Sequence, residues 1–229
     1  MKFTTIVLIF IIFVILYSTY EKSCDETYNP NLERDGFIFL NSADKNHVLK
    51  HLPTGYQFMD YKYTIEGCTL STFHRDVTSS QYVFKTKHPT YTFITYDHGR
   101  PALSVCPGSH RTTPILLSQP ITVNSRYVLF NCDVVHAGSL NLHKLPRKAV
   151  QYKIVHNEDL SRLEHLNGID KVKKGDCDKR NNIAVDILYR KLSILFSYIV
   201  NHQLTPYLQS RESNLICKLF GEERCFYNK

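Results

Sequence analysis

The sequence predicts a mainly β protein whose core is a double-stranded β-helix, the jelly-roll or cupin-like architecture, with flanking α-helices and a preceding N-terminal transmembrane helix. Three observations support this fold class. Residues 55–155 contain short runs rich in Val, Ile, Tyr, Phe and Thr, punctuated by Gly, Pro, Asn and Asp, a pattern typical of antiparallel sandwiches and barrels. An apolar run precedes this block, and a charged, helix-like pattern follows it after about residue 156.

Composition excludes several other classes of protein. The chain has 229 residues, of which 43% are hydrophobic and 21% charged, so it is neither disordered nor fibrous. Seven cysteines are too few for a disulfide-scaffold miniprotein. The formal charge of +7 favours anionic surfaces without indicating nucleic acid, and no nucleic-acid partner is expected. We therefore expect one packed domain with appendages.

The N-terminal run FTTIVLIFIIFVILY contains no charged residue and reaches about 18 residues when it is extended to Tyr20. A membrane-spanning helix needs about 20 residues. A cleaved signal peptide and a buried core strand or helix are the alternatives. Against the signal peptide, Ser18-Thr19-Tyr20 places a bulky Tyr where a small residue is expected. We predict a single-pass signal anchor over residues 1–21 and a membrane location. The side of the membrane stays open, because the flanking charges nearly balance.

The rest of the chain divides into a juxtamembrane linker over 22–31, the jelly-roll core over 32–156 and a C-terminal helical extension over 157–229 that packs on the core. Strands are expected in the runs YQFMDYKYTI, YVFKTK, YTFITYD, ALSVCPG, PITVNSRYVLFN and AVQYKIVH. The basic run 171–180 indicates a solvated loop, with attraction to anionic headgroups as the alternative; it consists of Lys171, Lys173, Lys174, Lys179 and Arg180.

The segment 183–200 has a helical apolar stripe that includes Leu188, Leu192, Leu195 and Ile199. We expect this stripe to pack on the sheet; dimerisation and membrane-surface attachment are the alternatives. The cysteines show no CxxC or metal-knuckle spacing. Whether Cys217 and Cys225 form a disulfide stays open, as does the oligomeric state.

Three residues in the β-rich block suggest a metal site. Strand alternation sends His74 and Asp76 to one face, and His136 follows the later run RYVLFNCDVV. Two histidines and one carboxylate on one face of an octahedral ion leave positions open, the arrangement that non-haem Fe(II) oxygenases use. Arg147, in the next strand-like run, carries a guanidinium fork suited to the distal carboxylate of a chelating cosubstrate.

At these residues the sequence resembles the phytanoyl-CoA dioxygenase family of Fe(II)/2-oxoglutarate-dependent oxygenases over most of residues 32–155. The resemblance rests on Arg34-Asp35-Gly36-Phe37, on the HxD pair His74 and Asp76, on the PGSH turn at 107–110, and on the string from His136 through Ser139 and Asn141 to Arg147. Two departures are Gly99-Arg100-Pro101, where the family commonly has Asn-Gly, and a compact segment between Asp76 and Pro107.

The resemblance implies a function. His74, Asp76 and His136 would ligate Fe(II), Arg147 would bind the far carboxylate of 2-oxoglutarate, and Ser139 and Asn141 would assist by hydrogen bonding. The enzyme would use O2 to hydroxylate a small-molecule or lipid-like substrate of unknown identity, with 2-oxoglutarate converted to succinate and CO2. The PGSH turn would shape the barrel mouth, with His110 as a fourth ligand the less favoured alternative.

Two other functions compete with this one. A prolyl or lysyl protein hydroxylase shares the HxD pair and the distal histidine, but its usual basic residue for the cosubstrate is Lys, whereas this chain has Arg147. A non-enzymatic jelly-roll membrane or envelope protein would keep the fold alone. The intact set of four residues argues against that reading.

Overall fold

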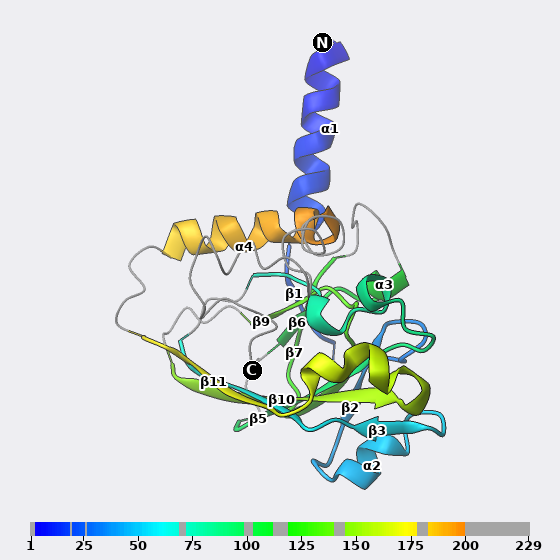
Figure 1. The fold of residues 1–229 in the computed structure, drawn as a ribbon. Helices are drawn as coiled ribbons and strands as arrows, with labels where there is room; N and C mark the ends of the chain where they lie inside the picture. The colour runs from blue at the N-terminus through cyan, green and yellow to red at the C-terminus, as the bar shows by residue number, and fades with distance from the viewer. Residues whose placement is uncertain are drawn as a thin grey trace, which may run out of the picture.

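The structure is a computed structural model that describes residues 3–18, 20–25, 27–68, 72–98, 103–111, 119–139, 145–177 and 183–199. Within these residues the fold is mainly β, with two sheets and flanking helices (Figure 1), and it is compatible with the expected jelly-roll core. The larger sheet has the order β11-β4-β10-β5-β8-β2, with β3 paired to β10, and the smaller has the order β1-β7-β6-β9.

The strands of the larger sheet are β2 (Phe37–Leu40), β3 (Tyr56–Phe58), β4 (Tyr61–Gly67), β5 (Tyr91–Tyr96), β8 (Tyr127–Asn131), β10 (Arg147–His156) and β11 (Ile169–Gly175). Those of the smaller sheet are β1 (Lys22–Ser23), β6 (Leu103–Val105), β7 (Ile121–Val123) and β9 (His136–Gly138). Most of the pairs are antiparallel, but β1–β7 and β4–β11 are parallel. Five of the six predicted strand runs are confirmed.

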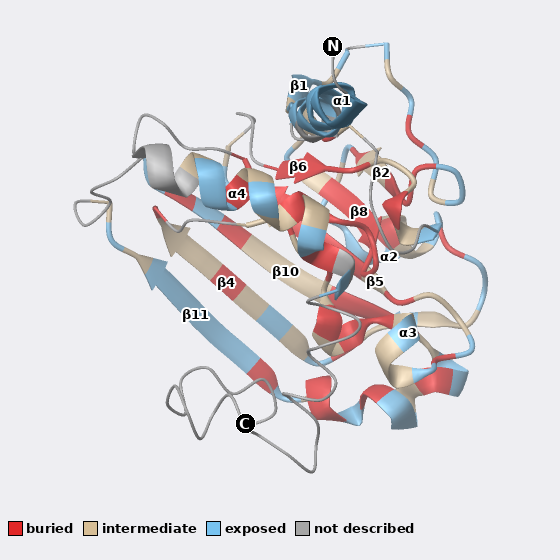
Figure 2. Ribbon diagram, turned by 90° about the horizontal axis from the view of Figure 1, so that it is seen from above, coloured by how far each residue is buried: buried red, intermediate tan, exposed pale blue. Residues whose placement is uncertain are grey.

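The main core lies between the two sheets. It joins Phe37, Ile94 and Phe130 of the larger sheet to Leu103 and Val105 of the smaller, all of them buried. Because side chains alternate along a strand, the opposite face of the larger sheet needs its own cover. The short helix α2 (Lys45–Leu49), capped by the Asp44 side chain, supplies that cover for the cluster around Val48. Figure 2 shows how the buried residues concentrate in the central strands.

Two expectations for local structure were wrong. The run YVFKTK was expected to be a strand, but it carries the end of helix α3 (Gln81–Phe84), which closes with Lys85 in the left-handed conformation. The basic run 171–180 was expected to be a loop, but its first part forms the end of β11, which pairs with β4. Lys171, Lys173 and Lys174 are exposed on β11, and lysines on an edge strand discourage pairing with other chains.

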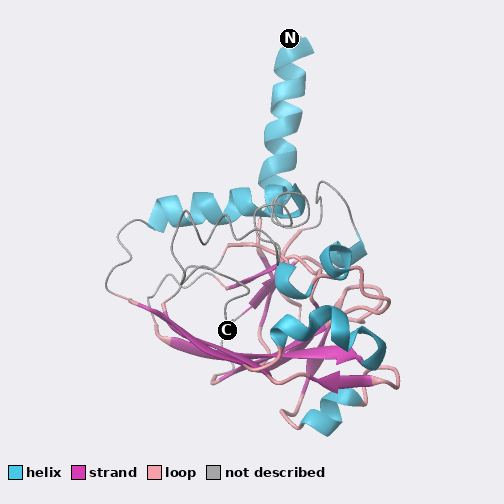
Figure 3. Ribbon diagram, in the orientation of Figure 1, coloured by secondary structure: helices cyan, strands magenta, loops and turns pink. Residues whose placement is uncertain are grey.

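The remaining helical elements are α1 (Phe3–Ser18), α4 (Ile183–Tyr198) and the 3-10 helices η1 (Val77–Ser79), η2 (Ser109–Arg111) and η3 (Asn157–Leu166). Figure 3 shows α1 standing away from the body of the protein and α4 lying across the end of α1 that is nearest to the body. At 1.5 Å per residue, the 16 residues of α1 extend about 24 Å. In the part of the chain that the structure describes, no helix is both long and apolar enough to cross a membrane.

The prediction for the C-terminal apolar stripe was wrong in its register. Leu188, Leu192 and Ile199 are exposed, whereas Arg190 and Ile194 are buried. The reason is the Arg190 guanidinium, which donates to the Glu21 carboxylate at 2.7 and 2.9 Å and to the Gly138 carbonyl at 2.6 Å. These bonds turn the helix so that the Arg190 face meets the smaller sheet, which leaves Leu188, Leu192 and Ile199 outside and Leu195 half-buried.

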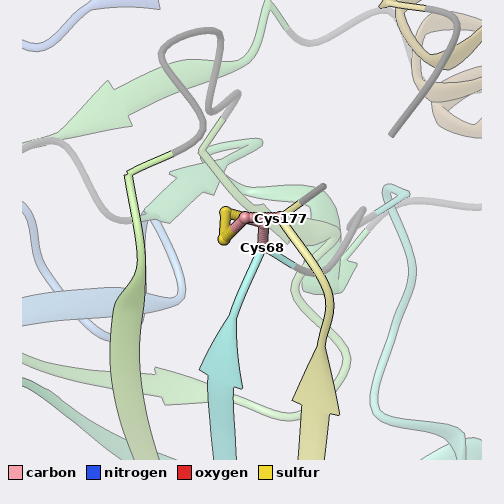
Figure 4. Close-up of a disulfide and its surroundings, with 2 residues drawn as sticks. All are labelled: Cys68 and Cys177. Atoms are coloured by element: carbon pink, nitrogen blue, oxygen red, sulfur yellow. A yellow bond between two sulfur atoms is a disulfide. The ribbon is translucent and has the colours of Figure 1, made fainter. Parts of the chain in front are cut away.

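A disulfide joins Cys68, just after β4, to Cys177, just after β11 (Figure 4). This pairing leaves no signal in the sequence, because 109 residues separate the two cysteines and their spacing matches no motif. Among the described residues, Cys24, Cys106 and Cys132 are free thiols. Cys217 and Cys225 lie outside the described residues.

Candidate metal centre

The backbone brings His74 and His136 side by side. The two residues form an isolated antiparallel bridge in which each amide N–H donates to the other residue's carbonyl at 2.9 Å. Two residues later, the Asp76 N–H donates to the Cys132 carbonyl at 2.8 Å, which holds the chain against the end of β8 before η1 begins. The segment carrying the HxD pair is therefore fixed by three hydrogen bonds to the 132–136 segment.

The three side chains converge as the spacing predicts. Asp76 Oδ1 lies 3.5 Å from His136 Nε2 and 3.8 Å from His74 Nε2, and the two imidazole centroids are 4.5 Å apart. One ligand atom from each residue lies within 4.8 Å of the others, so the group can surround a single metal ion.

A hydrogen bond at Nδ1 of each imidazole determines which ring nitrogen can bind a metal. His74 Nδ1 bonds to the Thr72 carbonyl at 2.8 Å, and His136 Nδ1 bonds to the Val134 carbonyl at 2.9 Å. A carbonyl can only accept, so both Nδ1 atoms carry the proton and both Nε2 atoms offer a lone pair. His136 Nε2 is buried and has no hydrogen-bond partner in the described part of the chain. A buried acceptor without a partner is costly, and a metal ion would satisfy it.

The two oxygens of Asp76 have different surroundings. Oδ1 faces the histidines, whereas Oδ2 accepts from Thr92 Oγ1 and from Lys153 Nζ, each at 2.6 Å. Lys153 is 1% exposed, and its ammonium also bonds to Thr92 Oγ1 at 2.8 Å and to Cys132 Sγ at 3.7 Å. The carboxylate is thus fixed through one oxygen and presents the other to the site.

This environment sets the protonation of the centre. Burial would raise the pKa of Asp76, but the Lys153 ammonium and the two histidines more than offset this, so the pKa lies well below its usual value. Burial lowers the pKa of His136 to about 4, although Asp76 opposes the shift. Burial would lower the pKa of Lys153, but Asp76 raises it instead. At neutral pH the centre therefore holds a carboxylate, a neutral His136 and a charged Lys153.

The PGSH turn supports the approach to His136. The Ser109 hydroxyl accepts from the Val135 N–H at 2.8 Å, and the Ser109 carbonyl accepts from the buried guanidinium of Arg75 at 2.9 Å. His110 does not join the group of three, because its Nε2 bonds to the Glu33 carbonyl at 3.1 Å.

Arg147 and Ser139 lie together at the start of β10. Arg147 is 9% exposed, and its Nη1 donates to the Ser139 carbonyl at 2.8 Å, with the Ser139 hydroxyl at 3.5 Å. Ser139 follows His136 by three residues, so this contact links the arginine to the strand that carries the distal histidine. Asn141 lies outside the described residues.

Sequence reasoning missed Lys153. A signal was present, because Lys153 follows Arg147 by six residues on one strand, and an even spacing places both on the same face. A lysine inside the run QYKIV, in a strand expected to face the core, needs a buried anionic partner.

The centre is open on one side. The His74 side chain is 40% exposed and that of His136 only 3%. A metal held by the three side chains would be screened from solvent near His136 and accessible near His74. The arrangement can hold a divalent cation and leave room for further ligands.

No family model matches the chain, and no curated protein matches it. Similar solved structures include the non-heme alpha ketoglutarate dependent epimerase SnoN from nogalamycin biosynthesis, with 13% identity, a TM-score of 0.36 and coverage of 55% of this chain and 79% of that one. EvdO2 from Micromonospora carbonacea var. aurantiaca has 14% identity and a TM-score of 0.36, with coverage of 47% and 55%. The non-heme monooxygenase ThoJ in its apo form has 11% identity and a TM-score of 0.36, with coverage of 71% of each chain.

This chain spans about half the length of EvdO2, at 55%, and of the similar structure EvdMO1, at 48%. With identities of 11–14% and TM-scores of 0.36, the similarity to SnoN, EvdO2 and ThoJ assigns no activity, metal or substrate to this chain. The resemblance to the phytanoyl-CoA dioxygenase family stays a prediction from the sequence.

Proposed function

We propose that the protein is an Fe(II)/2-oxoglutarate-dependent oxygenase of the phytanoyl-CoA dioxygenase type. One observation carries the proposal: the buried Nε2 of His136, which has no hydrogen-bond partner among the described residues, faces Asp76 Oδ1 and lies in one group with His74. Two imidazoles and one carboxylate are the donor set of non-haem Fe(II) oxygenases. The hydrogen bonds on both Nδ1 atoms hold the tautomer that a metal requires.

In this proposal each residue has a distinct role. His74, Asp76 and His136 hold the iron, and Lys153 and Thr92 keep Asp76 in place by binding its second oxygen. Fe(II) with 2-oxoglutarate and O2 supplies the oxidising chemistry when bound, giving succinate, CO2 and a hydroxylated product.

The proposed cosubstrate residue is Arg147. Its guanidinium binds the far carboxylate of 2-oxoglutarate, and Ser139 orients that guanidinium through the contact described above. Asn141 is proposed to assist by hydrogen bonding. The substrate is a small or lipid-like molecule that enters on the exposed His74 side.

We also propose attachment to a membrane through the apolar N-terminal segment. The described side chains of α1 are exposed and, apart from Thr4, Thr5 and the hydroxyl of Tyr17, apolar. Helix α4 lies across the base of α1 with Leu188, Leu192 and Phe196 exposed (Figure 1). The buried Arg190–Glu21 ion pair fixes this arrangement. The Cys68–Cys177 disulfide favours an oxidising compartment for the folded domain, because such bonds persist there.

One observation favours a rival function. The Lys153 ammonium already neutralises Asp76 without a metal, as expected if the group only stabilises a non-enzymatic jelly-roll protein. A protein hydroxylase of the prolyl or lysyl type is a further alternative and would use the same metal ligands.

The deciding experiment measures iron content and succinate formation from 2-oxoglutarate in the purified full chain, with His136→Ala as the inactive control. We expect about one iron per chain and succinate formation in the wild type, and neither in His136→Ala. Wild-type protein that binds no iron and forms no succinate would favour the structural rival. Turnover with prolyl or lysyl peptides would favour the protein hydroxylase.

Membrane attachment is tested separately by carbonate extraction. The full chain is expected to pellet with membranes and to keep its N-terminus. Ile12→Lys, which changes an exposed residue of α1, should release the chain without lowering its melting temperature. A mature chain beginning near residue 21 would contradict the anchor and leave the oxygenase proposal intact.

A further inference from the structure

A second cluster of potential metal ligands lies at the far end of β10. His156 ends that strand, Glu158 follows in η3, and His88 lies in the loop before β5. One ligand atom from each of the three residues lies within 4.8 Å of the others. The centroids of the two imidazoles are 3.8 Å apart, and His88 Nε2 lies 3.7 Å from Glu158 Oε2. None of these residues belongs to the candidate metal centre, and we call them the rim cluster.

Buried side chains hold His88 in place. The carboxylate of Asp159, which is 1% exposed, accepts from the Lys87 N–H at 2.8 Å and from the His88 N–H at 2.9 Å. This clamp fixes the loop before β5 against η3. The position of His88 beside Glu158 is therefore set by the fold rather than by the exposed side chains alone.

His156 is fixed in a similar way. Its imidazole packs edge-on against Tyr56 at a centroid distance of 5.2 Å, and the Tyr56 hydroxyl donates to the Pro89 carbonyl, next to His88, at 3.0 Å. Gly55 lies so close that any side chain there would collide with the imidazole. The Glu158 N–H donates a long hydrogen bond of 3.4 Å to His156 Nδ1, and a metal bound at Nδ1 would have to replace this bond. One tyrosine thus links both histidine-bearing segments.

We propose that the rim cluster binds a divalent metal ion with the ligand preferences of Zn²⁺, through His88, His156 and Glu158. Two imidazoles and one carboxylate form a known three-ligand set for Zn²⁺, with the fourth position left to water. The Glu158 side chain is 53% exposed and that of His88 38%, so an ion can reach the cluster from solvent.

Lys87 opposes this binding. Its Nζ lies 3.0 Å from Glu158 Oε2, the same oxygen that faces His88. The ammonium must move aside when a metal binds, and its side chain is 64% exposed, so nothing holds it by burial. Binding at the rim should therefore be weaker than at a site without a competing cation.

The test is a calorimetric titration of the full chain with Zn²⁺ in the His136→Ala background, which removes a ligand of the candidate metal centre. We expect one equivalent of Zn²⁺ to bind in this background. Adding His88→Ala should weaken that binding by about 100-fold or more, beyond the usual loss of a supporting group. Glu158→Gln, an exposed substitution that keeps the side-chain shape, should also weaken it.

The matched control is His51→Ala. His51 and His47 form a further histidine pair, with centroids 5.1 Å apart, but the metal-ligand groups among the described residues do not include them. Zn²⁺ affinity should be unchanged in this variant. Loss of binding in His51→Ala, or binding that survives both His88→Ala and Glu158→Gln, would overturn the proposal, as would no Zn²⁺ binding in the His136→Ala background. None of these results depends on whether the chain is an oxygenase.

Discussion

The candidate metal centre and the rim cluster arrange the same set of four side-chain groups in two different ways. Each has two histidines, one carboxylate and one lysine bound to that carboxylate. In the centre, Lys153 takes Asp76 Oδ2 and leaves Oδ1 to the histidines. At the rim, Lys87 takes the same Glu158 oxygen that faces His88.

Burial explains the difference. A buried charge must be paired and hydrogen-bonded, so both oxygens of Asp76 have fixed neighbours. An exposed carboxylate is solvated by water, so its oxygens do not each need a fixed partner. Lys87 and His88 can therefore face the same oxygen of Glu158. The interactions that position Asp76 in the centre therefore also stabilise the fold. The exposed side chains of the rim cluster contribute little to the stability of the fold.

The largest expected effect is on stability. Asp76→Ala leaves the Lys153 ammonium buried without its carboxylate and should destabilise the metal-free protein by about 3–5 kcal/mol. Glu158→Ala should leave the unfolding midpoint unchanged, because its lysine partner is exposed. Thermal unfolding of the full chain measures both. Adding Lys153→Met to Asp76→Ala should recover much of the loss, and equal effects of the two carboxylate variants would contradict the comparison.

The next prediction concerns Lys153 itself. Lys153→Met leaves Asp76 with Thr92 as its hydrogen-bond donor, so the metal-free protein should melt earlier than the wild type. Fe(II) should then raise the melting temperature more than it does in the wild type, because the dication replaces the lost positive charge. Lys148→Met, an exposed lysine of the same strand, is the control and should behave like the wild type. An Fe(II)-induced rise no larger than in the wild type would contradict this prediction.

Much of the sheet could be predicted from the sequence, because alternation and turn residues are local signals. The errors came where a distant contact overrides the local pattern. The lysines of β11 look like a solvated loop until β4 supplies hydrogen bonds along one edge. Similarly, the apolar stripe through Leu192 looks like the inner face of α4, but the ion pair between Arg190 and Glu21 turns another face inward. Pairing over 169 residues leaves no local trace.

The three residues of the candidate metal centre could be predicted to converge because HxD spacing and a distal histidine form a pattern that a family resemblance supports. The groups around them could not. Thr92 and Lys153 reach Asp76 from strands 16 and 77 residues away, and neither belongs to a motif. The rim cluster was missed for the same reason, since His88 and His156 are brought together by Asp159 and Tyr56 rather than by sequence spacing.

Arg147 sharpens the contrast, because the proposal gives the centre a cosubstrate residue and the rim none. Arg147→Ala should still bind Fe(II) but should bind 2-oxoglutarate about 30-fold to several thousand-fold more weakly, corresponding to a loss of about 2–5 kcal/mol. Arg147→Lys should recover part of the affinity, since it keeps the charge but loses the fork. Zn²⁺ binding at the rim should be unchanged in both variants. Calorimetric titration gives all three affinities, and parallel loss of Fe(II) and 2-oxoglutarate would indicate unfolding instead.

The smallest expected effect concerns the lysine of the rim. Lys87→Ala removes a cation that shares Glu158 Oε2 with the proposed metal, so Zn²⁺ should bind more tightly. Because exposed ion pairs are weak, the gain should be at most about fivefold. Lys85→Ala, a nearby substitution for which the structure records no ion pair among the described residues, is the control for the change in net charge.

The two lysines should also differ in their effect on stability. Lys153→Met lowers the melting temperature of the metal-free protein, whereas Lys87→Ala leaves it unchanged. If Lys87→Ala weakened Zn²⁺ binding, Lys87 would support the rim cluster instead of competing with the metal. The contrast between Asp76, whose two oxygens have different partners, and Glu158, whose Oε2 faces both Lys87 and His88, would then fail.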